Sequence, residues 1–413
     1  AVFFRGADPN LQPTPLFLDV RSGEAVDPAV RGVAGVALDL RLGRYLSAGV
    51  RAHYDTDPTN SPLARTRKVV PLDPRGELDQ FWVRLGGGAG ALTVGRMSLL
   101  WGPSPRGGLV LSGQAPALDM VHGKLNLWGH SLESFLANLS GAGEDLRILY
   151  GHRVVLNPLK TLTVSLVDMT LVRRRTAGVY WPFLVPWIPN FFPEWRDFPG
   201  VPRGSGVNSQ VSAAVEWRPG PRFFFEFLGD DVRWSEYQET YPNRFAVSAG
   251  VDHEWDRWRG GYEFRRVESW TYTHFQPSTA LRQFRWPLGA PEGPDGDRHI
   301  LWGVAGGGDW TLHLTGERRR RGENRLGDVW DGEGRRGEGF PRGMVETRWI
   351  LEAGLRRRVS RWGTAHLSAF YQDIDNLNNQ PGRRSLLGLQ AGFHLLSPAL
   401  TVNWLPSSAR HGS

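Results

Sequence analysis

The sequence predicts an all-β fold, a transmembrane antiparallel β-barrel of about 18 strands whose long loops fold into the lumen or cap one end. Three observations predict it. Apolar side chains recur at every second position, the alternate positions carry polar and ionised groups, and short turns alternate with long loops. Helical periodicity is almost missing, and no stretch reaches the ~18 uninterrupted apolar residues of a membrane-spanning helix.

Alternation marks the strands one by one. In chain order the alternating segments of the first half are Leu16–Arg21, Gly32–Leu40, Ser47–Tyr54, Leu78–Leu85, Ala91–Arg96, His122–Trp128, Ser134–Leu139, Leu146–Val154 and Leu162–Val167. Those of the second half are Ser209–Trp217, Phe223–Phe227, Phe245–Asp252, Tyr262–Arg265, His299–Ala305, Trp310–Glu317, Arg348–Arg356, His366–Gln372, Leu387–Leu395 and Ala399–Trp404. Most are about 7–11 residues long, which suits a tilted strand that crosses a bilayer.

Two further features favour a membrane barrel over a soluble β-sandwich or propeller. The second face of the strands repeatedly carries charges that suit a wet lumen: Glu216, Asp252, Glu263, Arg265, Glu352 and Arg356. Short turns such as Pro219–Pro221 and Asp256–Trp258 alternate with long loops: Arg173–Val207, Gly229–Asn243, Trp270–Arg298 and Arg318–Val345. No blade-length repeat is visible, which counts against a propeller. A soluble all-β protein remains the alternative.

Length and composition indicate the domain organisation, the location and the kinds of partner. The 413 residues are predicted to form one barrel domain, 16–404, between a short N-terminal segment, 1–15, and a C-terminal tail, 405–413. Residues 1–15 contain no signal peptide, so we expect the mature form of an exported protein, located in the outer membrane. The net charge of +7 is dispersed, without a basic run at helical spacing, and predicts no nucleic-acid partner.

The sequence predicts no enzyme. The absence of cysteine excludes disulfides, thiolate metal sites and cysteine nucleophiles. Gly-x-Ser-x-Gly, His-Glu-x-x-His and Walker motifs are missing, and no pair of carboxylates is fixed by its spacing as acid and base. We therefore expect no catalytic residues, no metal site and no cofactor.

The longest loop combines prolines with aromatic residues. Between Tyr180 and Phe198 it carries Trp181, Trp187, Phe191, Phe192 and Trp195 among four prolines. Proline prevents regular structure and stiffens the chain. Aromatic faces held out on such a chain would stack on sugar rings, so this loop is a candidate carbohydrate site; a lumenal plug or an aromatic cap is the structural alternative.

Two smaller aromatic groups are further candidates for carbohydrate contact. Trp270 and Tyr272 lie in one long loop, and Trp234 and Tyr237 lie in another, beside an aspartate pair, Asp230 and Asp231. An interfacial aromatic belt is the favoured interpretation of the first group, and aspartate in a turn needs no ligand.

A run of four arginines forms a predicted basic loop: Arg318, Arg319, Arg320 and Arg321. The planar guanidinium suits carboxylate and phosphate, so the run is a candidate contact for acidic polysaccharide or lipopolysaccharide phosphates. A solvated run of charges is the alternative.

One block of sequence is more specific than a pattern. From Leu78 the chain reads LDQFWVRLGGGAGALTVGRMSLLWGPSPRGGLVLSGQAPALDMV. This resembles the Wzi-type capsule-assembly family of outer-membrane proteins, in which Val-Gly-Arg is followed by Trp-Gly-Pro, a glycine turn and a Leu-x-x-Ser-x-x-Ala-like stretch. The matching positions are Val94, Gly95, Arg96, Trp101, Gly102, Pro103, Gly107, Gly108, Leu109, Leu111, Ser112 and Ala115. The family's N-terminal helical bundle has no counterpart before Leu16.

The resemblance implies an eighteen-stranded barrel that binds surface polysaccharide in a lectin-like way and helps to hold capsule on the cell. Its partners would be surface polysaccharide, outer-membrane lipid and other envelope proteins. A passive porin for small, anionic solutes and a structural envelope protein that contacts a surface layer are the alternatives.

The Trp-Gly-Pro block also has a physical interpretation of its own. Gly102 permits a backbone conformation that other residues rarely adopt, and Pro103 fixes the exit from the turn. We expect this tight turn to fold into the lumen and narrow it. Arg96 is then expected to form a salt bridge with a lumenal carboxylate.

Overall fold

The computed structural model describes residues 16–22, 28–42, 45–55, 76–139, 146–174, 206–230, 244–274, 276–284, 286–329, 339–360, 363–395 and 402–404. Regular structure in these parts is almost entirely strand, and the helices are two single turns, η3 (Pro277–Thr279) and η4 (Leu377–Asn379). No helix in the described parts is long and apolar enough to cross a membrane.

Nineteen of the described strands form one sheet, in which every pairing is antiparallel except that of β23 with β2. The first nine are β1 (Leu16–Ser22), β2 (Pro28–Leu42), β3 (Leu46–Asp55), β4 (Gly76–Gly87), β5 (Gly90–Met97), β8 (Leu118–Leu127), β9 (His130–Leu139), β10 (Leu146–Leu159) and β11 (Leu162–Arg174). The others are β12 (Val207–Trp217), β13 (Arg222–Asp230), β14 (Phe245–Trp255), β15 (Trp258–Val267), β18 (Gly296–Gly307), β19 (Trp310–Arg321), β20 (Glu346–Ser360), β21 (Gly363–Asp375), β22 (Arg383–Leu395) and β23 (Val402–Trp404).

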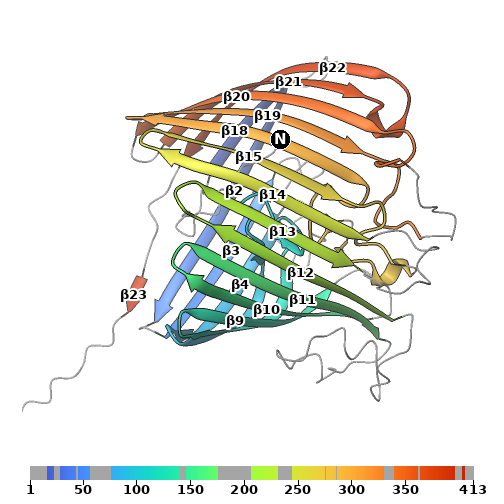
Figure 1. The fold of residues 1–413 in the computed structure, drawn as a ribbon. Helices are drawn as coiled ribbons and strands as arrows, with labels where there is room; N and C mark the ends of the chain where they lie inside the picture. Colours follow the sequence, from blue (N-terminus) through green and yellow to red (C-terminus); the bar gives the residue numbers. More distant parts are fainter. Residues whose placement is uncertain are drawn as a thin grey trace, which may run out of the picture.

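The pairing closes the sheet into a barrel. Each strand pairs with its neighbours in chain order, and β1 pairs with both β2 and β22, where Leu16 lies opposite Leu395. The 19 strands less β23 therefore form a closed antiparallel wall of 18, as predicted (Figure 1). The predicted segment Ala399–Trp404 contributes only β23, which lies parallel to the end of β2. It is not a wall strand, because β22 already has its partner in β1.

The connections differ in length at the two ends, as the sequence predicts. At one end, hereafter the short-turn end, two to four residues join β4 to β5, β8 to β9, β12 to β13 and β14 to β15. At the other, the long-loop end, much longer connections join β5 to β8 and β15 to β18. Two small hairpins lie within these long connections, β6 (Leu100–Trp101) with β7 (Leu111–Ser112), and β16 (Arg282–Gln283) with β17 (Trp286–Pro287).

The outer face of the wall is apolar over its middle. Many outward residues of the strands expose large apolar side chains, among them Leu92 and Val94 on β5 and Trp349 and Leu351 on β20. A soluble sandwich would bury this face, so the soluble alternative is wrong. At the short-turn end the belt is bordered by exposed tryptophans typical of a membrane interface: Trp128, Trp217, Trp255, Trp258 and Trp310.

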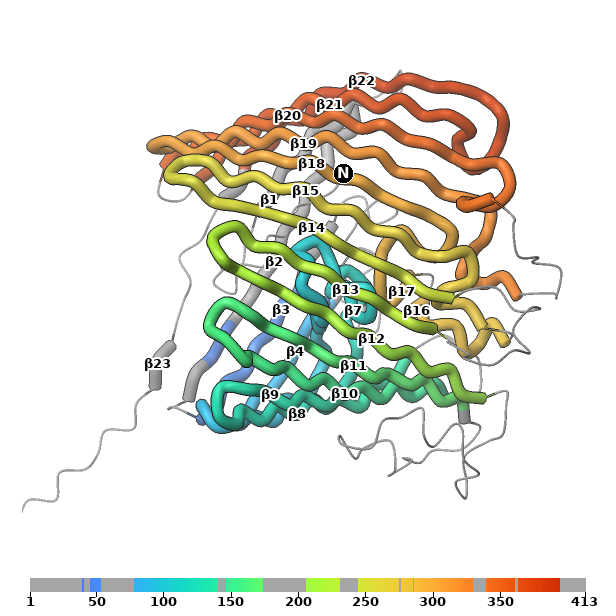
Figure 2. Tube along the Cα trace, in the orientation of Figure 1, coloured from blue at the N-terminus to red at the C-terminus, as the bar shows by residue number. Residues whose placement is uncertain are grey.

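The hydrophobic core lies inside the barrel. Inward-facing residues of the wall, such as Phe135, Leu149 and Met169, form one buried cluster with residues of the two long connections, such as Leu109 and Leu281. Figure 2 shows the connection between β5 and β8 within the barrel, behind β12 and β13 in this view. These connections therefore occupy the lumen rather than the space outside it.

Candidate functional site: the lumenal plug

The plug consists of two connections that fold inward, residues 98–117 between β5 and β8 and residues 268–295 between β15 and β18. In the first, the Trp101 side chain is only 1% exposed. Its indole Nε1 donates to Glu133 Oε2 at 3.2 Å, and its ring packs edge-on against Phe135 at 5.0 Å. The Trp-Gly-Pro block is therefore anchored on the inner face of β9, and the prediction that its loop enters the lumen is confirmed.

Gly102 is required by both its backbone and its surroundings. Its φ of +150° is rarely adopted by residues with a side chain. A Cβ at this position would lie 2.5 Å from Gly108 Cα and 2.7 Å from Glu226 Oε2. The carbonyl of Pro103 then accepts from Arg222 Nη1 at 2.9 Å. The predicted tight turn is confirmed, and it is held against β13.

Wall side chains satisfy the polar backbone of this first connection. Both oxygens of Glu226 accept from Leu109 N at 3.1 Å. Glu263 Oε2 accepts from Ser104 Oγ at 2.8 Å, and Arg265 Nη2 donates to Gly107 O at 2.8 Å. Backbone buried away from water needs such partners, which Glu226 on β13 and Arg265 on β15 provide, while Glu263 binds a side chain of the same connection.

The second connection packs on the first through Tyr272, which is fully buried. Its hydroxyl donates to Leu109 O at 2.7 Å and accepts from Ala290 N at 3.1 Å, while its own backbone N–H donates to Asp230 Oδ2 at 2.6 Å. Burial raises the pKa of the Tyr272 hydroxyl, which stays protonated and keeps donating. Another link is made by Ser112 N, which donates to Leu288 O at 2.9 Å.

A ladder of ion pairs joins the plug to the wall. Arg265 contacts Glu263 at 2.7 Å and Glu292 at 3.1 Å. Arg298 contacts Glu292 at 3.1 Å and Glu317 at 2.6 Å. Burial acts to raise the pKa of Glu292, but the neighbouring guanidinium groups outweigh it and hold the pKa at about 2. Glu292, in the second connection, is thus the shared partner of arginines on β15 and β18.

Several predicted site residues lie outside the described residues. These are Trp181, Trp187, Phe191, Phe192, Trp195, Trp234 and Tyr237. Trp270 and Tyr272 are described, and both are buried in the plug, so the prediction of an interfacial belt for them is wrong. The fully enclosed Tyr272 ring is a packing residue with no face left for a sugar. Trp270 is 6% exposed, with the Arg342 guanidinium 5.4 Å from its ring.

The prediction that Arg318–Arg321 form a loop is wrong. The four residues are the last of β19, and they pair with both β18 and β20. Strand alternation divides them: Arg319 contacts Glu317 on the inner face, whereas Arg320 pairs with Asp297 on the outer face. The arginine run looks like a loop in the sequence, but both neighbouring strands continue beside it and extend the ladder.

Arg96 forms the predicted salt bridge with a carboxylate, but the pair lies on the outer face of the wall and not in the lumen. It contacts Asp119 through two bonds of 2.7 Å. The two residues are cross-strand partners and share the face of Val94 and Val121, which face outward. Counting by two from Val94 would have placed Arg96 on the outer face. The expected lumenal location is therefore wrong.

Other elements of the site had weak signals in the sequence. Asp230, which the sequence places beside one of the aromatic groups, is fully buried and accepts from the backbone of Tyr272. Glu292 lies in a connection without periodicity, so nothing in the sequence marked it. Ser112, a position of the family motif, is buried and joins the two connections. The described residues contain no cluster of three or more acidic or histidine side chains able to hold a metal ion.

Comparison with solved structures shows the fold. The Escherichia coli protein Wzi, described as an outer-membrane protein involved in group 1 capsule assembly and as a carbohydrate-binding β-barrel, matches 94% of this chain and 84% of its own with a TM-score of 0.65. The chain has the fold of an outer-membrane β-barrel. Sequence identity to Wzi is 12%. Pseudomonas aeruginosa OccK10 (OpdN) is similar over 92% of this chain and 97% of its own, at 8% identity and a TM-score of 0.50. No protein-family model and no curated protein sequence matches the chain.

Substitution of Gly102 by alanine tests the anchoring of the plug. The added methyl group meets backbone and carboxylate at contact distances that require movement, so we expect Gly102→Ala to lower the free energy of unfolding by about 2 kcal/mol. Gly303→Ala on β18 is the matched control, because a Cβ there has nothing within 4 Å. Urea unfolding of detergent-folded protein measures both. Equal stability of the two variants would contradict the packing described.

Glu292 gives the plug a pH dependence of known sign. Its pKa is lower in the folded protein than the ordinary 4.5, so its ionisation stabilises the fold above about pH 4.5, and this stabilisation is lost as the pH falls towards 2. We expect Glu292→Gln to be less stable than wild type at pH 7 and to lose roughly 2 kcal/mol less between pH 7 and pH 3.

Urea titrations at the two pH values, followed by tryptophan fluorescence, measure this difference. Asp256→Asn, which removes an exposed carboxylate in a short turn, is the control and should keep the wild-type pH dependence. An unchanged pH dependence in Glu292→Gln would show that the ladder does not stabilise the plug.

Proposed function

We propose that this barrel binds or anchors surface polysaccharide in a lectin-like, non-catalytic way. The observation that supports the proposal best is the packed lumenal plug, in which Trp101, Leu109 and Tyr272 are almost completely buried. A barrel filled by such a core presents its long-loop end as a binding surface rather than as the mouth of a wide channel.

The likeness to Wzi supports the same proposal through its architecture. Wzi is a carbohydrate-binding barrel, and the Trp-Gly-Pro block of this chain, which resembles the Wzi-type family, builds the centre of the plug. In this proposal the proline-aromatic segment around Trp181, Trp187 and Trp195 supplies stacking faces for sugar rings, from the connection that follows β11. Capsule-type polysaccharide is the proposed ligand, and other envelope proteins are the proposed neighbours in the assembly.

A passive porin for small, anionic solutes is the second candidate, since arginines line the lumen. The described ladder weakens this candidate, because Arg265, Arg298 and Arg319 all contact carboxylates and their charges are compensated. A structural envelope protein that contacts a surface layer is the third. It would bind no glycan and would copurify with a protein partner.

Ionic conductance separates the binding protein from the porin. We expect the wild-type protein in planar bilayers to show no long-lived open steps, because the two connections pack inside the barrel against its wall. A variant in which a short Gly-Ser linker replaces residues 103–116 is the control for insertion and should conduct. Stable open steps in the wild-type protein would favour the porin.

Binding to polysaccharide extracted from the source cells tests the proposal directly. We expect saturable binding by wild type. When Trp181, Trp187 and Trp195 are changed together to alanine, we expect the affinity to fall by about tenfold or more. The matched control changes three exposed tryptophans of the short-turn end, Trp128, Trp217 and Trp258. Absence of binding by wild type, or equal loss in both variants, would reject the proposed site.

A further inference from the structure

The outer face of β15, β18, β19 and β20, which lie side by side (Figure 1), changes from apolar to charged towards the long-loop end. The last apolar row includes Tyr262, Leu301 and Leu351, which are all exposed. The next two rows towards the loops are Phe264, His299, Arg318 and Trp349, and then Arg266, Asp297, Arg320 and Thr347. Charge is tolerated on the lipid face only near an interface, so this step marks the headgroup boundary, and the long loops assign it to the outer leaflet.

The charged groups that are exposed at this boundary are guanidinium groups. The Arg320 side chain is 30% exposed, whereas that of its partner Asp297 is only 4% exposed. The Arg266 side chain is 37% exposed, and that of its partner Glu268 is 13% exposed. Both arginines bind their carboxylate through Nε and Nη2, and among the described residues neither Nη1 has an acceptor. The two pairs therefore cover their carboxylates and leave guanidinium donors on the outside.

Arg318 adds a charge that no carboxylate of the described residues compensates. It is the outward neighbour of Arg320 on β19, and within the described parts of the chain it forms no ion pair. Its guanidinium lies 5.6 Å from the ring of Trp349, which is 52% exposed, so the charge stays at the outer surface. A charge at the edge of the hydrocarbon region costs free energy unless a counter-charge meets it. An anion from the membrane would supply that counter-charge.

The spacing of the three arginines suits one headgroup with more than one anionic group. Arg318 and Arg320 are two residues apart on one face of β19, a separation of about 7 Å. Arg266 lies two strands from Arg320 in the same row, at about 10 Å. Their long side chains can close part of these distances. The planar guanidinium matches phosphate oxygens in a bidentate way, so phosphate is the anion that this group fits best.

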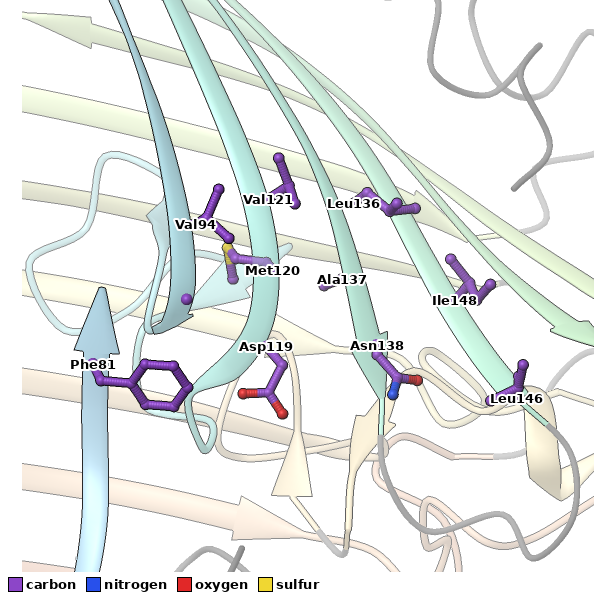
Figure 3. A pocket seen from close by; sticks show the side chains of 11 residues that line it. Phe81, Val94, Asp119, Met120, Val121, Leu136, Ala137, Asn138, Leu146 and Ile148 are labelled. Atoms are coloured by element: carbon purple, nitrogen blue, oxygen red, sulfur yellow. The ribbon is translucent and has the colours of Figure 1, made fainter. Parts of the chain in front are cut away.

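Other parts of the same boundary present carboxylates instead. Figure 3 shows Asp119 and Asn138 among the side chains around an outer hollow on β5, β8, β9 and β10. The Asp119 side chain is 45% exposed, whereas its partner Arg96 is covered. On β21 and β22, Arg383 is bound by Asp373 at 2.6 Å. Within the described wall, the exposed arginines of β15 and β19 are thus a local feature and not a general property of this rim.

We propose that Arg266, Arg318 and Arg320 form a binding site for the phosphate groups of an outer-leaflet glycolipid of the lipopolysaccharide type. The guanidinium groups donate to the phosphate oxygens at the headgroup boundary. The acyl chains of the same lipid lie along the apolar row next to it, against Leu301 and Leu351. The site lies on the outer wall and is independent of polysaccharide binding, which the proposed function assigns to the long loops.

Lipid retention by delipidated protein tests the site. The full chain is folded in detergent, and lipid A is added either with its phosphate groups or after their chemical removal, with the acyl chains unchanged. Native mass spectrometry then counts the lipids that stay bound. We expect the phosphorylated form to be retained at least several-fold better. Phosphatidylglycerol, which carries one phosphodiester, is the third probe and should be retained less than phosphorylated lipid A.

Three variants locate the binding. Arg318→Gln removes no ion pair of the described residues and should lower the preference for phosphorylated lipid A at least several-fold. Arg357→Gln is the matched control at the short-turn end, where the Arg357 guanidinium lies 4.8 Å from the ring of the outward Trp310. Arg383→Gln is the control in the row of Arg320, beside carboxylates. Both controls should keep the preference, and heat-modifiable migration on gels confirms that each variant is folded.

Three results would overturn the proposal. Equal retention of the two forms of lipid A would show that phosphate is not recognised. Retention of phosphatidylglycerol equal to that of phosphorylated lipid A would show a site for any anionic lipid. An unchanged preference in Arg318→Gln, or an equal loss in Arg318→Gln and Arg357→Gln, would show that the arginines of this boundary do not form the site.

Discussion

The structure depends on wall side chains that satisfy the buried backbone of the plug. A barrel of this size encloses more space than its own inward side chains fill, and chain placed inside it loses its hydrogen bonds to water. Here Glu226 and Arg265 bind the backbone of the first connection directly, and Asp230 binds that of the second. The apolar residues between them then form a core that resembles that of a soluble domain, enclosed by the membrane wall.

This arrangement explains why charged side chains lie buried around the plug. Each guanidinium of the ladder described above contacts a carboxylate, so the charges support the plug instead of attracting solute. Breaking such a buried pair leaves an uncompensated charge inside the protein. This lowers the stability of the fold far more than breaking a surface pair does. The same wall reverses the usual order of a soluble protein: its apolar belt faces lipid, and its polar face meets the protein interior.

Much of the fold follows from the sequence, because a strand between lipid and lumen must alternate. That alternation predicted the wall strands, the two kinds of connection and the inner positions of Glu263 and Arg265. The glycine and proline after Trp101 predicted a fixed turn. The outward position of Arg96 could also have been predicted from the sequence, since Arg96 follows the outward Val94 by two residues.

The rest depends on contacts between segments far apart in the chain. The hydroxyl of buried Tyr272 binds Leu109 and Ala290, and neither lies near it in sequence. Glu292 has no periodic neighbours that would mark it as the partner of Arg265 and Arg298. The composition of Arg318–Arg321 predicts a solvated loop. The run is nevertheless part of a wall strand, because the strands on both sides pair with it.

Hydrogen–deuterium exchange of the protein in lipid bilayers tests the central claim, that the two inward connections form one packed unit with the wall. The amides of Leu109, Ser112 and Tyr272 all have buried acceptors in this account. They should therefore exchange as slowly as those of the neighbouring wall strands. Complete exchange of these three amides within seconds, beside protected strands, would contradict the account and leave an open barrel with unpacked loops.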